Sequence, residues 1–162
     1  MLLLTIISIS SCQKRTTPLT FKTETLKAET LGHCADGICP IIEIEKIKAF
    51  GREHFADTIN NAVDQVLLNN LVIAPEEEPD IKTLDQALEH FISSYRVYKS
   101  DFPEAGTEYE INSTSQVSYN GAQLLSIKFE NYTYWGGAHG YGSTTYLNFD
   151  KDAETSLNNE AL

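Results

Sequence analysis

A run of aromatic and glycine residues at positions 132–142 is the part of the sequence best suited to bind a ligand. It reads Tyr-Thr-Tyr-Trp-Gly-Gly-Ala-His-Gly-Tyr-Gly, with four glycines among its last seven residues. Glycines permit positive φ and close backbone approach, and the aromatic rings can stack on sugar or protein. The run is therefore either a tight turn in which His139 hydrogen-bonds loop backbone, or a binding surface. Its candidate ligand-binding residues are Tyr134, Trp135, Gly136, Gly137, His139 and Tyr141.

The sequence holds no recognisable catalytic constellation. The glycine run lacks both the Lys-Ser/Thr ending of a phosphate loop and the spacing of a dinucleotide fingerprint. No nucleophile elbow for Ser-His-Asp catalysis is present. The four histidines are scattered without an i, i+4 pair: His33, His54, His90 and His139. We therefore expect a domain without catalytic residues, without a metal and without a cofactor.

The first twelve residues indicate the compartment. Positions 1–11 carry no charge and contain a short apolar stretch, too short to span a bilayer, which is typical of a secretory signal. The sequence Ile-Ser-Ser-Cys ending at Cys12 resembles a bacterial lipobox, in which the cysteine is lipidated and becomes the mature N-terminus. Acyl chains would then hold the protein at a membrane, at about 0.8 kcal/mol per buried CH₂. We predict a signal peptide at 1–11, a tether at 12–18, and a location in the cell envelope: the periplasmic side of an outer membrane, or the cell surface.

Export makes the other two cysteines interpretable. Cys34 and Cys39 flank a turn-like Ala-Asp-Gly-Ile segment, and oxidising compartments favour disulfides. We predict a small-loop disulfide between them. The alternative is a zinc site formed with His33, although a second CxxC motif or a paired histidine is missing.

The charge of the chain excludes one class of partner. The sequence has 12 Lys and Arg against 23 Asp and Glu, a formal charge of −11. Residues 49–162 hold 6 basic and 18 acidic residues, so their net charge is −12. Nucleic acid and anionic lipid surfaces need clustered Lys and Arg. We therefore expect no nucleic-acid partner.

Hydrophobic spacing predicts the elements that position these residues. Alternation at 19–25 predicts a strand. At 41–48 the phase of the β-branched pattern slips between Ile44 and Ile47, which indicates a bulge or a strand buried on changing faces. Helical spacing predicts one helix at 52–70 and a second that follows a capping box at 83–86 and ends near Lys99. Further strands are predicted at 109–119, 123–133 and 143–149. The fold class is α+β, an antiparallel sheet with two helices packed on one face.

The dipeptide Asn120-Gly121 predicts a hairpin between two of these strands. A two-residue turn would scatter the apolar residues over both faces. A longer or bulged connection, such as a three-residue loop at 120–122 that pairs Val117 with Leu125, keeps them together. The residues that this parity places on one face are Tyr109, Ile111, Ile127 and Phe129.

The residues from Asn131 to Gly140, followed by Tyr146 to Asp150, resemble a "Y-x-Y-x-GGAH … NFD" signature. It marks an extracellular domain shared by PdaC-type peptidoglycan deacetylases, RsiV-type anti-sigma factors and bacterial lipoproteins of unknown function. The resemblance covers roughly residues 40–155. It implies an envelope domain at 19–142, followed at 143–162 by the last strand and the start of a truncated C-terminal domain, which binds lysozyme in RsiV relatives.

These observations predict a lipid-anchored bacterial envelope protein with a non-catalytic binding domain. The expected partners are a peptidoglycan fragment or a cationic extracellular protein such as lysozyme, which an acidic face would steer in a salt-dependent way. The alternatives are an accessory domain of a peptidoglycan- or polysaccharide-modifying enzyme, such as a deacetylase, and a spacer that positions a C-terminal module.

Overall fold

The computed structural model describes residues 17–34, 38–72 and 80–157. The predicted signal peptide at 1–11, the lipidation site Cys12 and tether residues 12–16 lie outside these ranges. All of the described hydrogen bonds and core residues fall within 17–157, so a chain that begins at Thr17 contains the whole described fold. In the described ranges, no helix is both long and apolar enough to span a membrane.

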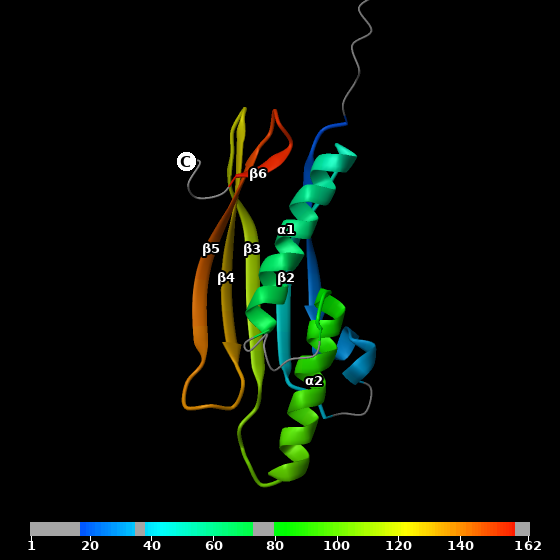
Figure 1. Ribbon diagram of the computed structural model, residues 1–162, viewed down its shortest axis with the longest axis vertical. Coiled ribbons are helices and arrows are strands. Elements are labelled where there is room, and N and C mark those ends of the chain that lie inside the picture. The colour runs from blue at the N-terminus through cyan, green and yellow to red at the C-terminus, as the bar shows by residue number, and fades with distance from the viewer. Residues whose placement is uncertain (1–16, 35–37, 73–79, 158–162) are drawn as a thin grey trace, which may run out of the picture.

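A six-stranded sheet in the order β1-β2-β3-β4-β5-β6 carries two helices on one side, which confirms the α+β class (Figure 1). The neighbours pair antiparallel except β2 and β3, which run parallel. Two short 3-10 turns follow β1, at Ala28–Thr30 and Gly32–Cys34. The elements are β1 Thr20–Lys27, β2 Ile41–Phe50, α1 Glu53–Leu71, α2 Leu84–Asp101, β3 Glu110–Asn120, β4 Leu124–Tyr134, β5 Tyr141–Asp150 and β6 Thr155–Leu157.

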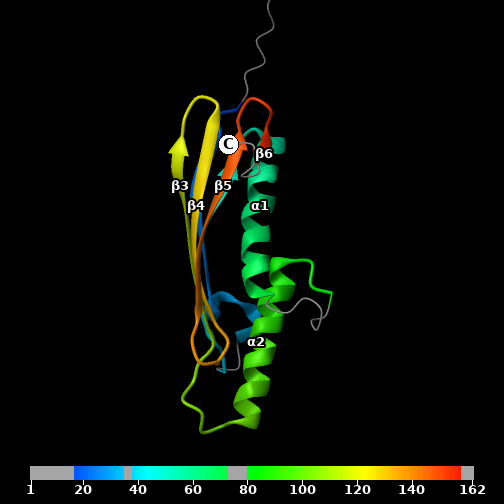
Figure 2. The same ribbon diagram turned by 60° about the vertical axis from the view of Figure 1, so that its left-hand side comes forward.

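The parallel pair is the main difference from a purely antiparallel sheet. Both helices lie between β2 and β3 in the chain. Figure 1 shows α1 running back along one half of the sheet and α2 continuing along the other half, so that β3 starts at the same end as β2. Figure 2 shows the two helices on the same side of the sheet. The helix pair is thus the crossover that parallel neighbours require.

The helices follow their apolar stripes. Helix α1 buries Phe55, Ile59, Val63 and Leu67 as predicted, while Val66 is half-buried at the rim of the core. Helix α2 begins with the predicted capping box: the Gln86 amide donates to Thr83 Oγ1 at 3.2 Å, and the Thr83 amide donates to Gln86 Oε1 at 3.2 Å. Its stripe Leu84, Leu88, Phe91, Ile92 and Tyr95 is buried.

The β3–β4 hairpin has the longer, bulged connection that its parity required. Residues 121–123 form the loop, and the register shifts between Val117 and Tyr119. Val117 pairs with Ile127 rather than with Leu125, so the predicted register is wrong by two residues. A shift of two keeps every side chain on its face. The four residues predicted to share a face are indeed buried: Tyr109, Ile111, Ile127 and Phe129.

The phase slip in β2 is a change of buried face. The pairing with β1 continues without interruption through the slip, but the ladder to β3 ends at Glu45 and Thr114. Beyond that point side chains replace β3 as hydrogen-bond partners of the β2 backbone: the Ile47 amide donates to Ser115 Oγ at 2.7 Å. Lys46, on the earlier buried side, pairs with Asp64 of α1.

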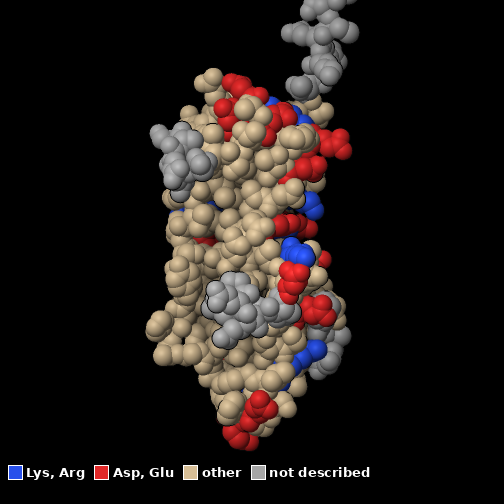
Figure 3. All heavy atoms as spheres, in the orientation of Figure 1, with Lys and Arg blue, Asp and Glu red and all other residues tan. Residues whose placement is uncertain are grey.

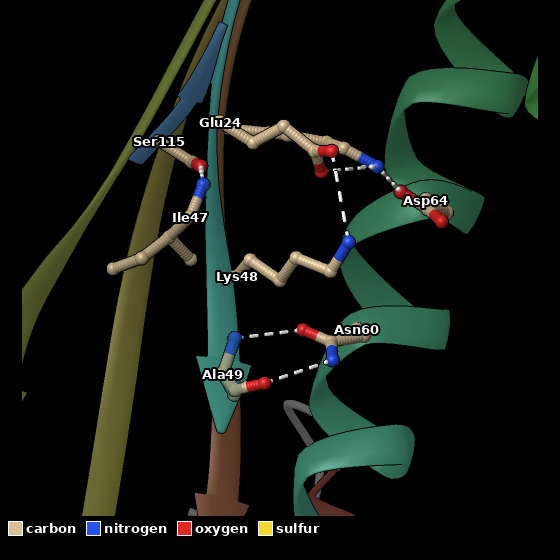
Figure 4. Close-up of polar contacts among 8 residues, drawn as sticks. Glu24, Ile47, Lys48, Ala49, Asn60, Asp64 and Ser115 are labelled. Atoms are coloured by element: carbon tan, nitrogen blue, oxygen red, sulfur yellow. Dashed lines mark hydrogen bonds and ion pairs between the residues drawn. The ribbon is translucent and has the colours of Figure 1, made fainter. Parts of the chain in front are cut away.

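Asn60 of α1 acts as a substitute strand partner for the end of β2. Its Oδ1 accepts from the Ala49 amide at 2.8 Å, and its Nδ2 donates to the Ala49 carbonyl at 3.1 Å (Figure 4). Ala49 is 2% exposed. Helix α1 therefore satisfies backbone groups at the end of β2 that β3 leaves unpaired, so the pairing of β2 with β3 can end at Glu45 and Thr114.

The N-terminal segment passes tightly over the turn between β2 and α1. Gly51 has φ +78°, and a Cβ on it would lie 2.2 Å from the Pro18 carbonyl oxygen. Glycine alone fits here, because both the backbone angle and the close approach exclude a side chain. The point at which the chain enters the domain is thus fixed beside Gly51.

Candidate functional site

The signature loop, residues 135–140, joins β4 to β5. Gly136 has φ +79°, and a Cβ there would lie 2.7 Å from Cε1 of Tyr109. Next to it, the Tyr134 hydroxyl donates to the Gly137 carbonyl at 2.8 Å. A Cβ on Gly140 would lie 2.3 Å from the hydroxyl oxygen of Tyr132, so that tyrosine ring packs against bare backbone. Two of the loop glycines therefore make room for tyrosine rings.

Trp135 points towards the helices. Its ring meets Phe91 of α2 edge-on, with centroids 4.7 Å apart and planes at 87°, and lies 5.7 Å from the ring of Tyr109. Among the described residues its buried Nε1 has no hydrogen-bond partner. The Trp135 ring thus packs against α2 and Tyr109. Burial raises the pKa of the Tyr109 hydroxyl.

The other candidate residues of the loop lie outward. His139 and Tyr141 are exposed, and the His139 Nδ1 lies 3.2 Å from the Gly140 carbonyl oxygen, a contact with loop backbone. Tyr134 is half-buried at the end of β4. The structure thus separates the six candidates: Trp135 faces the helices, whereas the tyrosines and His139 border the surface.

The sheet face opposite the helices carries two adjoining hollows, which sequence reasoning did not identify. The larger, of about 400 Å³, spreads over β3, β4 and β5. The smaller, of about 190 Å³, spreads over β1, β2 and β3. They meet at Asn112 and Thr114, which line both. We call this surface the open face; it is bordered by Tyr132 and Gly142, at the base of the signature loop.

Two rows of side chains cross the open face, set by the strand register. One row is Glu43, Asn112, Tyr132 and Gly142; the other is Glu45, Thr114, Glu130 and Thr144. Each row brings together carboxylate, amide or hydroxyl groups, and the first adds an aromatic ring. The outward parity of the β3–β4 hairpin was predictable from the sequence, but the neighbour β2 was not.

The charges of the open face are mostly acidic. Within the described residues, Glu43 and Glu45 are exposed and take part in no ion pair or hydrogen bond. Glu130 accepts from Lys128, with Oε1 and Nζ 2.8 Å apart. This hydrogen bond raises the pKa of Lys128. The two hollows are therefore lined by three carboxylates, those of Glu43, Glu45 and Glu130, and by one cation, Lys27, which lies opposite Glu43 on β1.

The cysteines form the predicted disulfide. Cys34 and Cys39 are bonded, with Cα atoms 5.6 Å apart, and the intervening Ile38 carbonyl accepts from Arg96 Nε of α2 at 3.2 Å. Both thiols of the alternative zinc site are thus used, and the side chain of His33 lies outside the described part. Among described residues, no group of three or more His, Cys, Asp or Glu side chains is arranged to hold a metal.

Comparison with solved structures identifies the same fold in longer chains. A DUF3298 family protein from Pseudomonas aeruginosa PAO1 is 17% identical with a TM-score of 0.52, and the match covers 90% of this chain and 57% of that chain. A member of the same family from Bacteroides fragilis NCTC 9343 is 20% identical with a TM-score of 0.58, covering 91% and 62% respectively. This chain thus spans about three fifths of the length of each.

Comparison by sequence gives the family. No curated protein matches the chain. A family model described as "Deacetylase PdaC" matches residues 41–141, from the start of β2 to the end of the signature loop. This range is well over half of the chain and includes the GGAH motif and the parts of the open face on β2, β3 and β4. The protein therefore belongs to the PdaC family.

Proposed function

We propose that this chain is a lipid-anchored envelope protein whose domain binds a wall component without catalysis. The observation that carries the proposal is the open face, with its two hollows joined at Asn112 and Thr114. Amide, hydroxyl and carboxylate groups form hydrogen bonds with sugar hydroxyls, and a tyrosine ring can stack on a sugar ring. The favoured ligand is the glycan of a peptidoglycan fragment.

Binding can be measured by calorimetry with purified muropeptides and a chain that begins at Thr17. Asn112→Ala removes a side chain at the centre of the face and should raise the Kd by about tenfold, the effect of one or two lost hydrogen bonds. Asn69→Ala is the matched control, because Asn69 is an exposed asparagine of α1, on the opposite side of the sheet from the open face. Equal affinity of Asn112→Ala and the wild type would refute the open face as the glycan site.

A cationic extracellular protein is the second candidate, favoured by the exposed carboxylates of Glu43 and Glu45. Lysozyme is a suitable probe. The double variant Glu43→Gln/Glu45→Gln should weaken its binding, and the difference from wild type should shrink as salt is added, because exposed charges are screened. Salt-independent binding would exclude this electrostatic mode.

The accessory-domain alternative is separated by a product assay. A deacetylase-associated domain with its own activity would release acetate from peptidoglycan, and a hydrolase would release reducing ends. We expect neither product from the chain alone. Release of either by wild type would replace the binding proposal with an enzymatic one.

The anchor is proposed from Cys12 and the apolar residues before it. Expression in bacteria fed an alkyne-labelled fatty acid should label the protein, and Cys12→Ser should abolish the label and release the protein from the membrane fraction. A labelled Cys12→Ser variant would contradict lipidation at this residue.

A further inference from the structure

Strand β5 has an unusually bare outer edge. Strand β6 pairs with β5 only from Asn148 to Asp150, so in the described part of the chain no strand covers residues 141–147. This stretch, Tyr-Gly-Ser-Thr-Thr-Tyr-Leu, contains no charged residue. In Figure 3 the charged atoms gather at the upper end, along the right-hand edge and at the lower tip, while the left side, where β5 runs, is almost wholly uncharged.

Among the residues that the structure describes, none pairs with the outward backbone groups of this edge, and these groups follow a defined pattern. The Lys151 amide donates to the Gln123 carbonyl at 2.7 Å across the β4–β5 ladder. Because antiparallel ladders alternate, every second residue back along β5 points its N–H and C=O away from β4. These outward residues are Gly142, Thr144 and Tyr146, and the same alternation explains why β6 begins its pairing at Asn148 and Asp150.

The opposite edge of the sheet is protected in the usual way. Strand β1 carries Lys22, Glu24 and Lys27 among its eight residues. Charged side chains on an edge strand discourage pairing with another chain. The contrast between the two edges of one sheet singles out β5 as a surface that accepts a further strand.

We propose that the occupant is a second copy of this chain, paired through β5 in antiparallel orientation about Thr144. In this register Thr144 faces Thr144 of the partner subunit, and Gly142 faces Tyr146 of the partner subunit. All of the outward residues are then used, and each such pair exchanges two hydrogen bonds. One surface patch thereby pairs with itself, as a two-fold dimer requires.

The side chains fit the same register. A tyrosine ring would cover bare glycine at Gly142, as the ring of Tyr132 covers Gly140 within the chain. On the helix side Ser143 would face Thr145 of the partner subunit, and Tyr141, 67% exposed in the single chain, would face its Leu147. Cross-strand pairs of these kinds stabilise sheets.

The lack of charge in residues 141–147 and the length of this stretch suit it to contact with a second copy. Each chain has a formal charge of −11, so two copies repel over most of their surfaces, and the uncharged stretch is where they can approach. It is bounded by the signature loop before Tyr141 and by β6 after Leu147. A partner strand of the same length therefore fits in the register centred on Thr144.

Analytical ultracentrifugation over a concentration series, with a chain that begins at Thr17, tests the proposal. We expect a monomer–dimer equilibrium. Hydrogen exchange at the Gly142, Thr144 and Tyr146 amides should slow as the concentration rises. Thr144→Pro removes an outward N–H from each copy without breaking a bond to β4, and should raise the dimer Kd by about tenfold or more. Thr144→Lys places like charges opposite each other and should act in the same direction.

Thr25→Lys is the matched control, since Thr25 is an exposed threonine on β1, the other edge strand; it should leave the equilibrium unchanged. Three results would overturn the proposal. One is a monomer at every soluble concentration. Another is a dimer that persists in both Thr144 variants, which would place the interface elsewhere. The third is a monomer with a protected Thr144 amide, which would show that another segment of the same chain covers the edge.

Discussion

Replacement of Asn60 by alanine should destabilise the domain by about 2–4 kcal/mol, because its side chain satisfies two backbone groups of β2. The substitution leaves the Ala49 N–H and C=O without partners, and Ala49 is 2% exposed. A buried backbone group without a hydrogen bond costs about 1–3 kcal/mol. Two such groups cost about 2–6 kcal/mol together. Because Asn60 is only half-buried, water can enter the space that its side chain leaves, and this places the expected loss in the lower part of the range.

Urea unfolding followed by far-UV circular dichroism measures this loss. With a slope of about 2 kcal/mol per M, the midpoint should fall by about 1–2 M. Asn60→Asp keeps an acceptor for the Ala49 amide but sets a second oxygen against the Ala49 carbonyl, so it should recover little stability at neutral pH. The control is Gln65→Ala on the same helix, whose side chain bonds the exposed Asn69 and whose loss should cost about 0.5 kcal/mol or less.

Hydrogen exchange gives an independent readout of the same contact. The Ala49 amide should exchange much faster in Asn60→Ala, whereas amides in the β3–β4 ladder should change only as global stability changes. If Asn60→Ala keeps the wild-type midpoint and slope, the claim that α1 satisfies the backbone at the end of β2 is wrong. Water or β3 must then supply the partners of Ala49.

Three further predictions concern Gly136, the disulfide and Tyr109. Gly136→Ala should lower the free energy of unfolding by about 2 kcal/mol or more, because φ is +79° and the new Cβ would meet Tyr109. The control Gly137→Ala, with nothing within 4 Å of its Cβ, should stay within about 0.5 kcal/mol of wild type. Equal losses of the two variants in thermal melts would contradict the strain predicted at Gly136. The double variant Cys34→Ser/Cys39→Ser should lose about 2 kcal/mol, the loop-closure contribution of a short disulfide, with a reducing agent lowering the wild-type Tm alike. Because burial raises the pKa of Tyr109, the folded chain keeps the hydroxyl proton at a pH near 10, where the unfolded chain releases it. The contribution of this group to the free energy of unfolding is therefore intact below about pH 10 and is lost as the pH rises further. Tyr109→Phe should lose less stability than wild type across that interval, and parallel pH profiles of the two proteins would contradict the prediction.

Features encoded by neighbouring residues could be predicted from the sequence. The capping box of α2 needs only Thr83 and Gln86, three positions apart. The side of the sheet on which each hairpin residue lies follows from alternation. This prediction was correct although the predicted register was wrong by two residues. The disulfide also follows from two nearby cysteines, given the prediction that the chain is exported.

Features that depend on distant partners could not. The change of buried face in β2 rests on Ser115, 68 positions from the Ile47 amide it satisfies. Nothing in the local pattern of β2 indicates that a helix side chain will pair with Ala49. The parallel neighbour β3, and with it the two rows of the open face, depends on where both helices return the chain.

The candidate site shows the same division. The glycine and aromatic run was identifiable as unusual, but an aromatic ring suits stacking on a ligand and packing in a core equally well. Phe91, on a helix far earlier in the chain, decides that Trp135 turns inward. The open face was missed because its polar side chains are individually ordinary and become a surface only when four strands align.

If the protein carries the proposed lipid anchor, the tight passage of Pro18 over Gly51 limits how far the domain can extend from the membrane. The signature loop lies at the other end of β5 from this point (Figure 1), and ten residues of strand span roughly 30 Å. If Cys12 carries the proposed acyl chains, the residues before Thr17 add at most about 15–20 Å. The signature loop would then lie at most some tens of ångströms above the bilayer, at the end of the domain away from the anchor.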